Sequence, residues 1–252
     1  SVTCTVAHAP APFVKARKVP AALFSAVAYA WAGEPQPSPE EAGGRQGHLA
    51  VGLFFRHRYL LLLALLIAAT QVMSTALDLR FSGLVEDAFS DKDARSAYLG
   101  GFYKLLNMAA ALLQFVVAPA VLRVLPLRVV HTAIPLIHLC AGLALLLRPT
   151  LLVGAAAFML FKALDYSLFR ASKEILYIPL SFDVRYRAKE MIDAFVYRFS
   201  KGGLGLALTL AAGVVGRLPG SVYPLVAMGA ALAWLPIVTY LLRHIPVEER
   251  AR

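Results

Sequence analysis

The sequence is short of charge and of cysteine. Only 16% of its 252 residues are charged, whereas 59% are hydrophobic. Charged residues make up about a quarter of an average soluble domain, so this composition excludes an ordinary soluble globular protein. The two cysteines, Cys4 and Cys140, give neither a disulfide framework nor the spacing of a metal site.

Long apolar runs fill most of the chain instead. A helix needs about 20 apolar residues to cross roughly 30 Å of hydrocarbon, and the runs of that length lie at 59–81, 98–122, 127–147, 151–176, 192–215 and 222–242. These runs do not alternate as strands do, so we expect helices that satisfy their own backbone hydrogen bonds rather than a barrel. The predicted fold class is all-α: a polytopic membrane protein with six transmembrane helices.

Positive charge gathers on alternate loops of this arrangement. A net charge of +10 would suit nucleic acid if it formed one patch, but the basic residues are spread over the loops that share one membrane side. They include Arg56, Arg58, Arg123, Arg128, Arg185, Arg187, Lys189, Arg243 and Arg250. The positive-inside rule then places both ends of the six-helix unit in the cytoplasm. We predict a multi-pass protein of the inner (plasma) membrane, with the lipid bilayer and not nucleic acid as its partner.

The N-terminal residues differ from the rest. An Ala-rich patch at 19–32 follows Lys15, Arg17 and Lys18, which fits a secretory signal, an interfacial helix or the tail of an upstream segment. Residues 33–47 have the Pro, Gly and Glu content of a linker. We divide the chain into an N-terminal segment and linker at 1–52, a six-helix transmembrane domain at 53–246 and a cytoplasmic tail at 247–252.

Polar side chains fall on one side of the first two predicted helices. At about 100° per residue, one arc of the first helix carries Gln71, Ser74, Thr75 and Asp78. Asp78 is read either as a carboxylate that faces a central cavity or as a residue at the outer headgroup boundary. In the second helix, Asn107 either lines a cavity or forms an interhelical hydrogen bond, and Lys104 either joins it or snorkels to the interface.

The sequence gives little support for an enzyme or for a metal site. His131 and His138 share a face of the third predicted helix, but no third ligand accompanies them, so we predict no metal site. The chain has no P-loop and no nucleophile, base and orienting group at interpretable spacing. We predict neither an enzymatic activity nor a cofactor.

Charge is instead concentrated between Phe161 and Gly203. One arc of roughly 140° on the fourth predicted helix carries Lys162, Asp165, Tyr166, Arg170, Lys173 and Tyr177. The start of the fifth helix repeats this pattern with Lys189, Asp193, Tyr197, Arg198 and Lys201. Arg and Lys suit phosphate and a Tyr ring suits a base, so the two helices are candidates for binding an anionic, base-bearing metabolite. The alternative is a basic loop between ion-paired helices, its cations neutralised by Asp165, Glu174, Glu190 and Asp193.

The same stretch resembles a known family. The matching motifs are YSLF at 166–169, Lys173-Glu174, YIPL at 177–180, Asp183, the spaced cations Arg185, Arg187 and Lys189, Ile192-Asp193 and Lys201-Gly202-Gly203. They are similar to the nucleotide transporter family, the ATP/ADP antiporters of plastids and obligate intracellular bacteria, which is distantly similar to the major facilitator superfamily. Ser82 and the Tyr197-Arg198 pair depart from plastid members and resemble members of the family from free-living bacteria.

This resemblance implies a carrier of two six-helix halves that exchanges nucleoside triphosphate for diphosphate by alternating access. The present chain looks like the C-terminal half, which implies that an N-terminal half or a second copy is its partner. By matching position, Asp78 would be a cavity carboxylate, and Lys173, Arg185, Arg187 and Lys189 would handle the nucleotide.

The predicted substrate-binding residues are Asp78, Lys104, Asn107, Lys162, Asp165, Arg170, Lys173, Glu174, Arg185, Arg187, Lys189, Asp193, Arg198 and Lys201. Two alternatives to a nucleotide antiporter stay open. One is a carrier of the same fold for another organic anion or a proton-coupled solute. The other is a non-transporting sensor or scaffold derived from a carrier.

Overall fold

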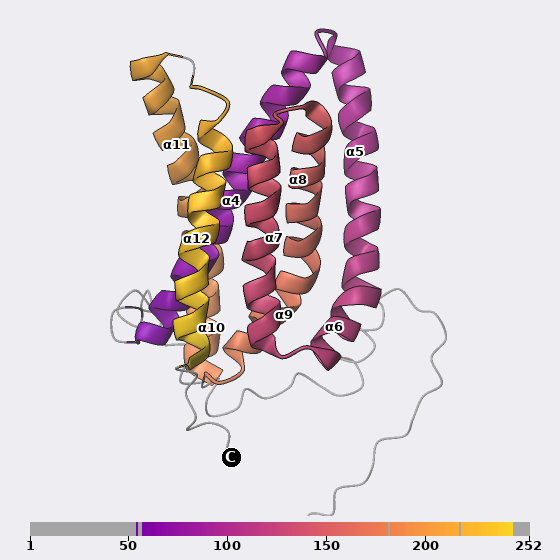
Figure 1. The fold of residues 1–252 in the computed structure, drawn as a ribbon. Coiled ribbons are helices and arrows are strands. Elements are labelled where there is room, and N and C mark those ends of the chain that lie inside the picture. Colours follow the sequence, from indigo (N-terminus) through magenta and orange to yellow (C-terminus); the bar gives the residue numbers. More distant parts are fainter. Residues whose placement is uncertain (1–53, 55–56, 181, 217, 244–252) are drawn as a thin grey trace, which may run out of the picture. The chain divides into compact units, whose positions relative to one another are not determined.

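A computed structural model describes Phe54 and residues 57–180, 182–216 and 218–243 (Figure 1). The predictions for the N-terminal segment and linker at 1–52, and for the tail at 247–252, lie outside these residues. Over the described ranges the chain is helical and contains no strand. The prediction of an all-α protein is therefore confirmed.

The helices follow one another through short turns, and three of them are interrupted by a π-helical turn, labelled η. In order, the elements are α4 (Arg58–Ala88), α5 (Lys92–Leu112), η1 (Leu113–Val117), α6 (Ala118–Val124), α7 (Leu127–Leu147), α8 (Leu151–Leu164), η2 (Asp165–Phe169), α9 (Arg170–Tyr177), α10 (Phe182–Met191), η3 (Ile192–Val196), α11 (Tyr197–Val215) and α12 (Val222–Arg243).

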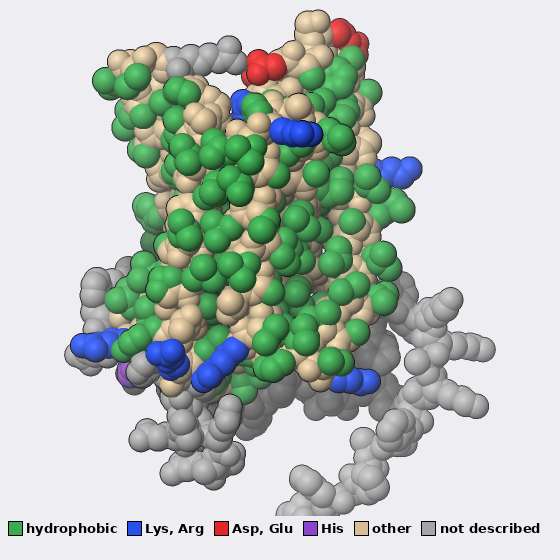
Figure 2. Space-filling view, viewed as in Figure 1, with side chains coloured by type: hydrophobic (Ala, Val, Ile, Leu, Met, Phe, Trp, Pro, Cys, Tyr) green, Lys and Arg blue, Asp and Glu red, His purple; other side chains and the backbone are tan. Residues whose placement is uncertain are grey.

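Five helical segments are long and apolar enough to cross a membrane: Arg58–Ala88, Lys92–Val124, Leu127–Leu147, Leu151–Tyr177 and Val222–Arg243. They confirm a polytopic membrane protein. The fifth predicted span, at 192–215, is helical but is not among them, because Asp193, Arg198 and Lys201 lower the hydropathy of its first half. Figure 2 shows hydrophobic side chains over most of one face, with Lys and Arg near both ends.

Helix α4 is the most buried of these elements. It packs against α8, α11 and α12, and α12 also packs against α7. Leu60, Leu63 and Leu66 of α4 are fully buried. Burial of such side chains contributes roughly 1.5 to 3 kcal/mol each in water, but inside a bilayer close packing takes over that role.

Close packing is clearest where α7 meets α12. A Cβ atom at Gly142 of α7 would lie 2.7 Å from Met228 Cγ of α12. No side chain larger than hydrogen fits there without a shift of Met228. The glycine thus permits the close approach of two helices, as small residues commonly do in membranes.

The two helices at the edges of Figure 1, α5 and α11, are the least covered. In α5 the buried residues are Phe102, Leu106 and Ala110, and α11 has none. Phe102 belongs to a ring cluster with Phe81 of α4 at 4.5 Å and Phe158 of α8 at 6.0 Å between centroids. This cluster attaches one side of α5, and its other side is left exposed.

Candidate functional site: a charged cavity between the helices

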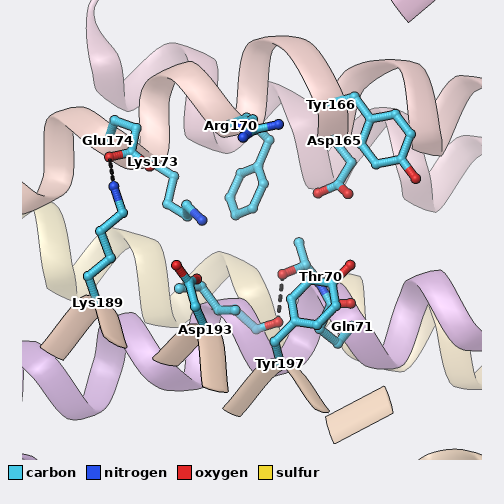
Figure 3. A pocket seen from close by; sticks show the side chains of 12 residues that line it. Thr70, Gln71, Asp165, Tyr166, Arg170, Lys173, Glu174, Lys189, Asp193 and Tyr197 are labelled. Carbon is cyan, nitrogen blue, oxygen red and sulfur yellow. Dashed lines mark hydrogen bonds and ion pairs between the residues drawn. The ribbon is translucent and has the colours of Figure 1, made fainter. Parts of the chain in front are cut away.

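A polar cavity of about 250 Å³ lies between α4, the η2–α9 segment and the α10–η3–α11 segment (Figure 3). Its lining residues are Ile67, Thr70, Gln71, Asp165, Tyr166, Phe169, Arg170, Lys173, Glu174, Lys189, Asp193 and Tyr197. Three of these side chains are cations and three are carboxylates. A group of this polarity inside a bundle of spanning helices marks a functional site by default.

Two of the π-helical turns form part of the wall. Turn η2 begins at Asp165, and turn η3 carries Asp193. A π-turn adds a residue to one turn of the helix, which changes the direction of the side chains around it, and such turns are frequent at functional sites. The carboxylates of both turns face the cavity.

One ion pair spans the cavity wall. Lys189 Nζ of α10 lies 2.7 Å from Glu174 Oε2 of α9, and the two side chains are 42% and 45% exposed. The same ammonium lies 5.9 Å from the centre of the Tyr177 ring. Lys189 therefore has two independent contacts that hold it at this end of the cavity (Figure 3).

The remaining charges face one another across the space. Lys173 reaches from α9 toward Asp193 on the opposite wall, and Arg170 lies between Lys173 and Asp165 (Figure 3). The Asp165 carboxylate is attracted by the positive charges of Lys162, Lys173 and Arg170. Each charge in the cavity thus has a neighbour of opposite sign.

Lys162 is buried behind this wall, in the core. Its ammonium donates to Ser74 Oγ of α4 at 2.9 Å. It also lies over the rings of Phe158, Phe161 and Tyr166, at 5.6, 5.8 and 5.4 Å from their centres. Cation–π contacts stabilise a desolvated ammonium by about 2 kcal/mol, so this cage supports a cation that the membrane interior disfavours.

Arg185 is engaged by the backbone. Its guanidinium donates to the carbonyl oxygens of Tyr177, Ile178 and Leu180 at 2.9, 2.7 and 3.0 Å. These carbonyls end α9 and form the turn that follows, where helices leave acceptors unsatisfied. Arg185 therefore joins α10 to the end of α9.

The structure brings together part of the predicted site. The predicted residues that line the cavity are Asp165, Arg170, Lys173, Glu174, Lys189 and Asp193. The others lie elsewhere. Asp78 is half-buried on α4, Lys104 and Asn107 are exposed on α5, Arg198 and Lys201 are exposed on α11, and Arg187 is half-buried on α10.

Sequence reasoning missed several lining residues. Thr70 lies one helical turn before Ser74 of the polar arc, and its hydroxyl donates to the Ile67 carbonyl at 2.7 Å. That spacing was the available signal. Ile67 and Phe169 give no such signal in the sequence, because an apolar side chain in an apolar helix does not mark a cavity. Phe169 also packs on Trp234 at 4.9 Å between ring centres.

Five helices are long and apolar enough to span a membrane, and two of them line a charged cavity together with the α10–η3–α11 segment. These features define a polytopic helical membrane protein with an internal polar site. Residues 129–244 match the TLC ATP/ADP transporter family, which confirms the resemblance to the nucleotide transporters. Over this matched part the chain is similar to that family.

Curated relatives give the same result. The chain is 27% identical to "ADP,ATP carrier protein 1" of Chlamydia pneumoniae over 168 residues, covering 59% of this chain and 33% of the relative. It is 27% identical to "ADP,ATP carrier protein 1" of Chlamydia trachomatis over 186 residues, covering 65% and 35%. It is 39% identical to "ADP,ATP carrier protein 3" of Rickettsia bellii over 62 residues, covering 25% and 12%.

The matches to the Chlamydia carriers span about a third of those proteins' length. No solved structure matches the chain significantly.

Proposed function

We propose that this chain forms the C-terminal half of a membrane carrier that exchanges adenine nucleotides, ATP for ADP, by alternating access. The observation that carries the proposal is the cavity in which Arg170, Lys173 and Lys189 meet Tyr166 and Tyr197. Carriage rather than catalysis follows from the relatives, which are named as carriers.

The chemistry of the cavity suits a nucleotide. Arg170 offers a forked donor for a phosphate group, and Lys173 and Lys189 offer compact charges. Tyr166 and Tyr197 supply rings on which a base can stack. Small-molecule sites usually measure about 300 to 1,000 Å³, whereas this cavity measures about 250 Å³. A further wall would enlarge it to the size that a nucleotide needs.

A partner supplies that wall in this proposal. Helices α5 and α11 expose most of their length, and a second six-helix unit packed against them would close the cavity from the open side. That unit is an N-terminal half or a second copy of this chain. Alternating access then rocks the two units around a site near the middle of the bilayer.

The orientation follows from the loops. Arg123 lies in the last turn of α6, Arg128 lies in the first turn of α7, and Arg185 and Lys189 lie on α10 at the same end of the bundle (Figure 1). By the positive-inside rule this end faces the cytoplasm. The proposal places the protein in the plasma membrane, with residues 53–246 as the transport domain.

Binding of labelled ATP, ADP and inorganic phosphate to the purified chain in detergent, at two salt concentrations, tests the function. We expect saturable ADP binding that weakens at high salt, because charge attraction is screened, and that falls at least tenfold in Lys173→Ala. Lys92→Ala is the matched control, because Lys92 is exposed at the start of α5 and does not line the cavity.

Exchange of ATP for ADP in liposomes with a supplied N-terminal half is the second step. Equal ADP binding by Lys173→Ala and Lys92→Ala would contradict the assigned site. Flux of another organic anion or of a proton-coupled solute without nucleotide exchange would favour the first alternative carrier, and binding without flux would favour a sensor.

A further inference from the structure

The cavity that is proposed to bind a nucleotide carries no net charge. Arg170, Lys173 and Lys189 supply three positive charges, and Asp165, Glu174 and Asp193 supply three negative ones. A nucleotide brings several negative charges into this space. Its phosphate groups must therefore pair with cations that the carboxylates of the cavity already attract.

Glu174 forms an ion pair with a cation of the cavity. Its Oε2 atom lies 2.7 Å from Lys189 Nζ, a distance typical of charge-assisted hydrogen bonds. A phosphate oxygen on Lys189 would need the same donor. Bound phosphate and the Glu174 contact therefore compete for one ammonium group.

The ion pair is easy to break. Both side chains are nearly half exposed, and exposed pairs of this kind contribute little to stability. Lys189 would keep its place when Glu174 leaves, because the Tyr177 ring lies 5.9 Å from the ammonium. Lys189 thus remains at the cavity while a phosphate group replaces Glu174 as its partner.

We infer that Glu174 is a resident anion of this site: it holds Lys189 while the cavity is empty and is displaced by a phosphate group of the nucleotide. In this role Glu174 lowers substrate affinity and speeds release. An exchanger benefits from this, because a substrate that must leave on each cycle cannot be held too tightly. The inference rests on the proposed function and adds a release role to Glu174.

Glu174→Gln keeps the size of the side chain and removes its charge. We expect ADP and inorganic phosphate to bind roughly three- to tenfold more tightly, which corresponds to the loss of a weak ion pair with Lys189. ADP release, measured after mixing with excess unlabelled ADP, should slow by a similar factor. Glu190→Gln is the matched control, because Glu190 is exposed beside Lys189 and does not line the cavity.

The same substitution in a Lys189→Gln variant tests whether the gain in affinity depends on Lys189. In Lys189→Gln, binding should be weaker, and the further change Glu174→Gln should tighten it less than twofold. A full three- to tenfold gain in that background would overturn the idea of displacement from Lys189.

The outcomes separate the two proposals. Wild-type ADP binding that Glu174→Gln leaves unchanged or weakens, relative to Glu190→Gln, overturns the resident-anion role and leaves the nucleotide site in place. Absence of ADP and phosphate binding in the wild type and in every variant overturns the proposed function, and this inference with it. Circular dichroism of each variant confirms that it retains its helices.

Discussion

The Lys162 ammonium donates to the Ser74 hydroxyl at 2.9 Å and so links α8 to α4 across 88 residues. Both side chains are buried, at 8% and 2% exposure. This hydroxyl supports the Lys162 cation inside the bundle, together with the aromatic rings and the charge of Asp165. The link also fixes the helix that carries Asp165 against the helix that carries Gln71.

Ser74→Ala should lower the free energy of unfolding by roughly 1 to 3 kcal/mol, because it leaves a buried ammonium without its acceptor. Thermal unfolding in detergent measures this loss. Thr75→Ala is the control, because the Thr75 hydroxyl donates to the Gln71 carbonyl of its own helix and holds no charge. Equal losses in the two variants would show that the link between the helices contributes nothing.

The double variant Ser74→Ala/Lys162→Met sharpens this prediction. Replacement of both partners by apolar groups is often nearly neutral. We therefore expect the double variant to be more stable than Ser74→Ala alone. A further loss in the double variant would mean that Lys162 stabilises the bundle through its rings and Asp165 rather than through Ser74.

Arg185→Lys should loosen the turn between α9 and α10. A lysine cannot reach the carbonyls of Tyr177, Ile178 and Leu180 together, since its donors sit on one atom. Hydrogen exchange should rise in peptides that cover residues 177–189. ADP affinity should fall because α9 and α10 both contribute to the cavity. Arg123→Lys, an exposed substitution of the same kind near the same membrane side, should change neither quantity.

Gly142→Leu should separate α7 from α12. The new side chain would meet Met228 at once, and overpacking of this kind costs typically 1 to 3 kcal/mol. Gly100→Leu is the control, because a Cβ at Gly100 meets no atom within 4 Å. Combining Gly142→Leu with Met228→Ala should restore part of the melting temperature. An unchanged melting temperature in Gly142→Leu would show that the two helices can shift apart freely.

The helices themselves were largely predictable from the sequence, because an apolar run of about 20 residues leaves few other choices. The third predicted span, 127–147, has the same bounds as α7. The last, 222–242, ends one residue before α12 does. The span predicted at 192–215 contains Asp193, Arg198 and Lys201, and it is the one that falls short in hydropathy.

The site was less predictable because it depends on departures from a regular helix. A helical wheel puts Lys162 and Asp165 in one polar arc, yet Lys162 is buried behind the wall and Asp165 lines the cavity. The π-turn that begins at Asp165 then changes the register of the residues that follow it, Arg170 and Lys173, relative to Lys162. Arg185 shows a second limit: a sequence reveals a cation but not the three carbonyls that a turn presents to it.

The tyrosines of the cavity test whether a base is recognised as well as a phosphate. Tyr166 and Tyr197 line the cavity from opposite walls (Figure 3). Loss of an aromatic platform costs about 1 to 3 kcal/mol per stacked base. Tyr197→Ala should therefore weaken ADP binding by roughly five- to a hundredfold, whereas binding of inorganic phosphate should stay within twofold. Tyr223→Ala, at the start of α12 and outside the cavity lining, should affect neither ligand. Equal weakening of ADP and phosphate in Tyr197→Ala would show that the ring supports the shape of the cavity and does not contact a base.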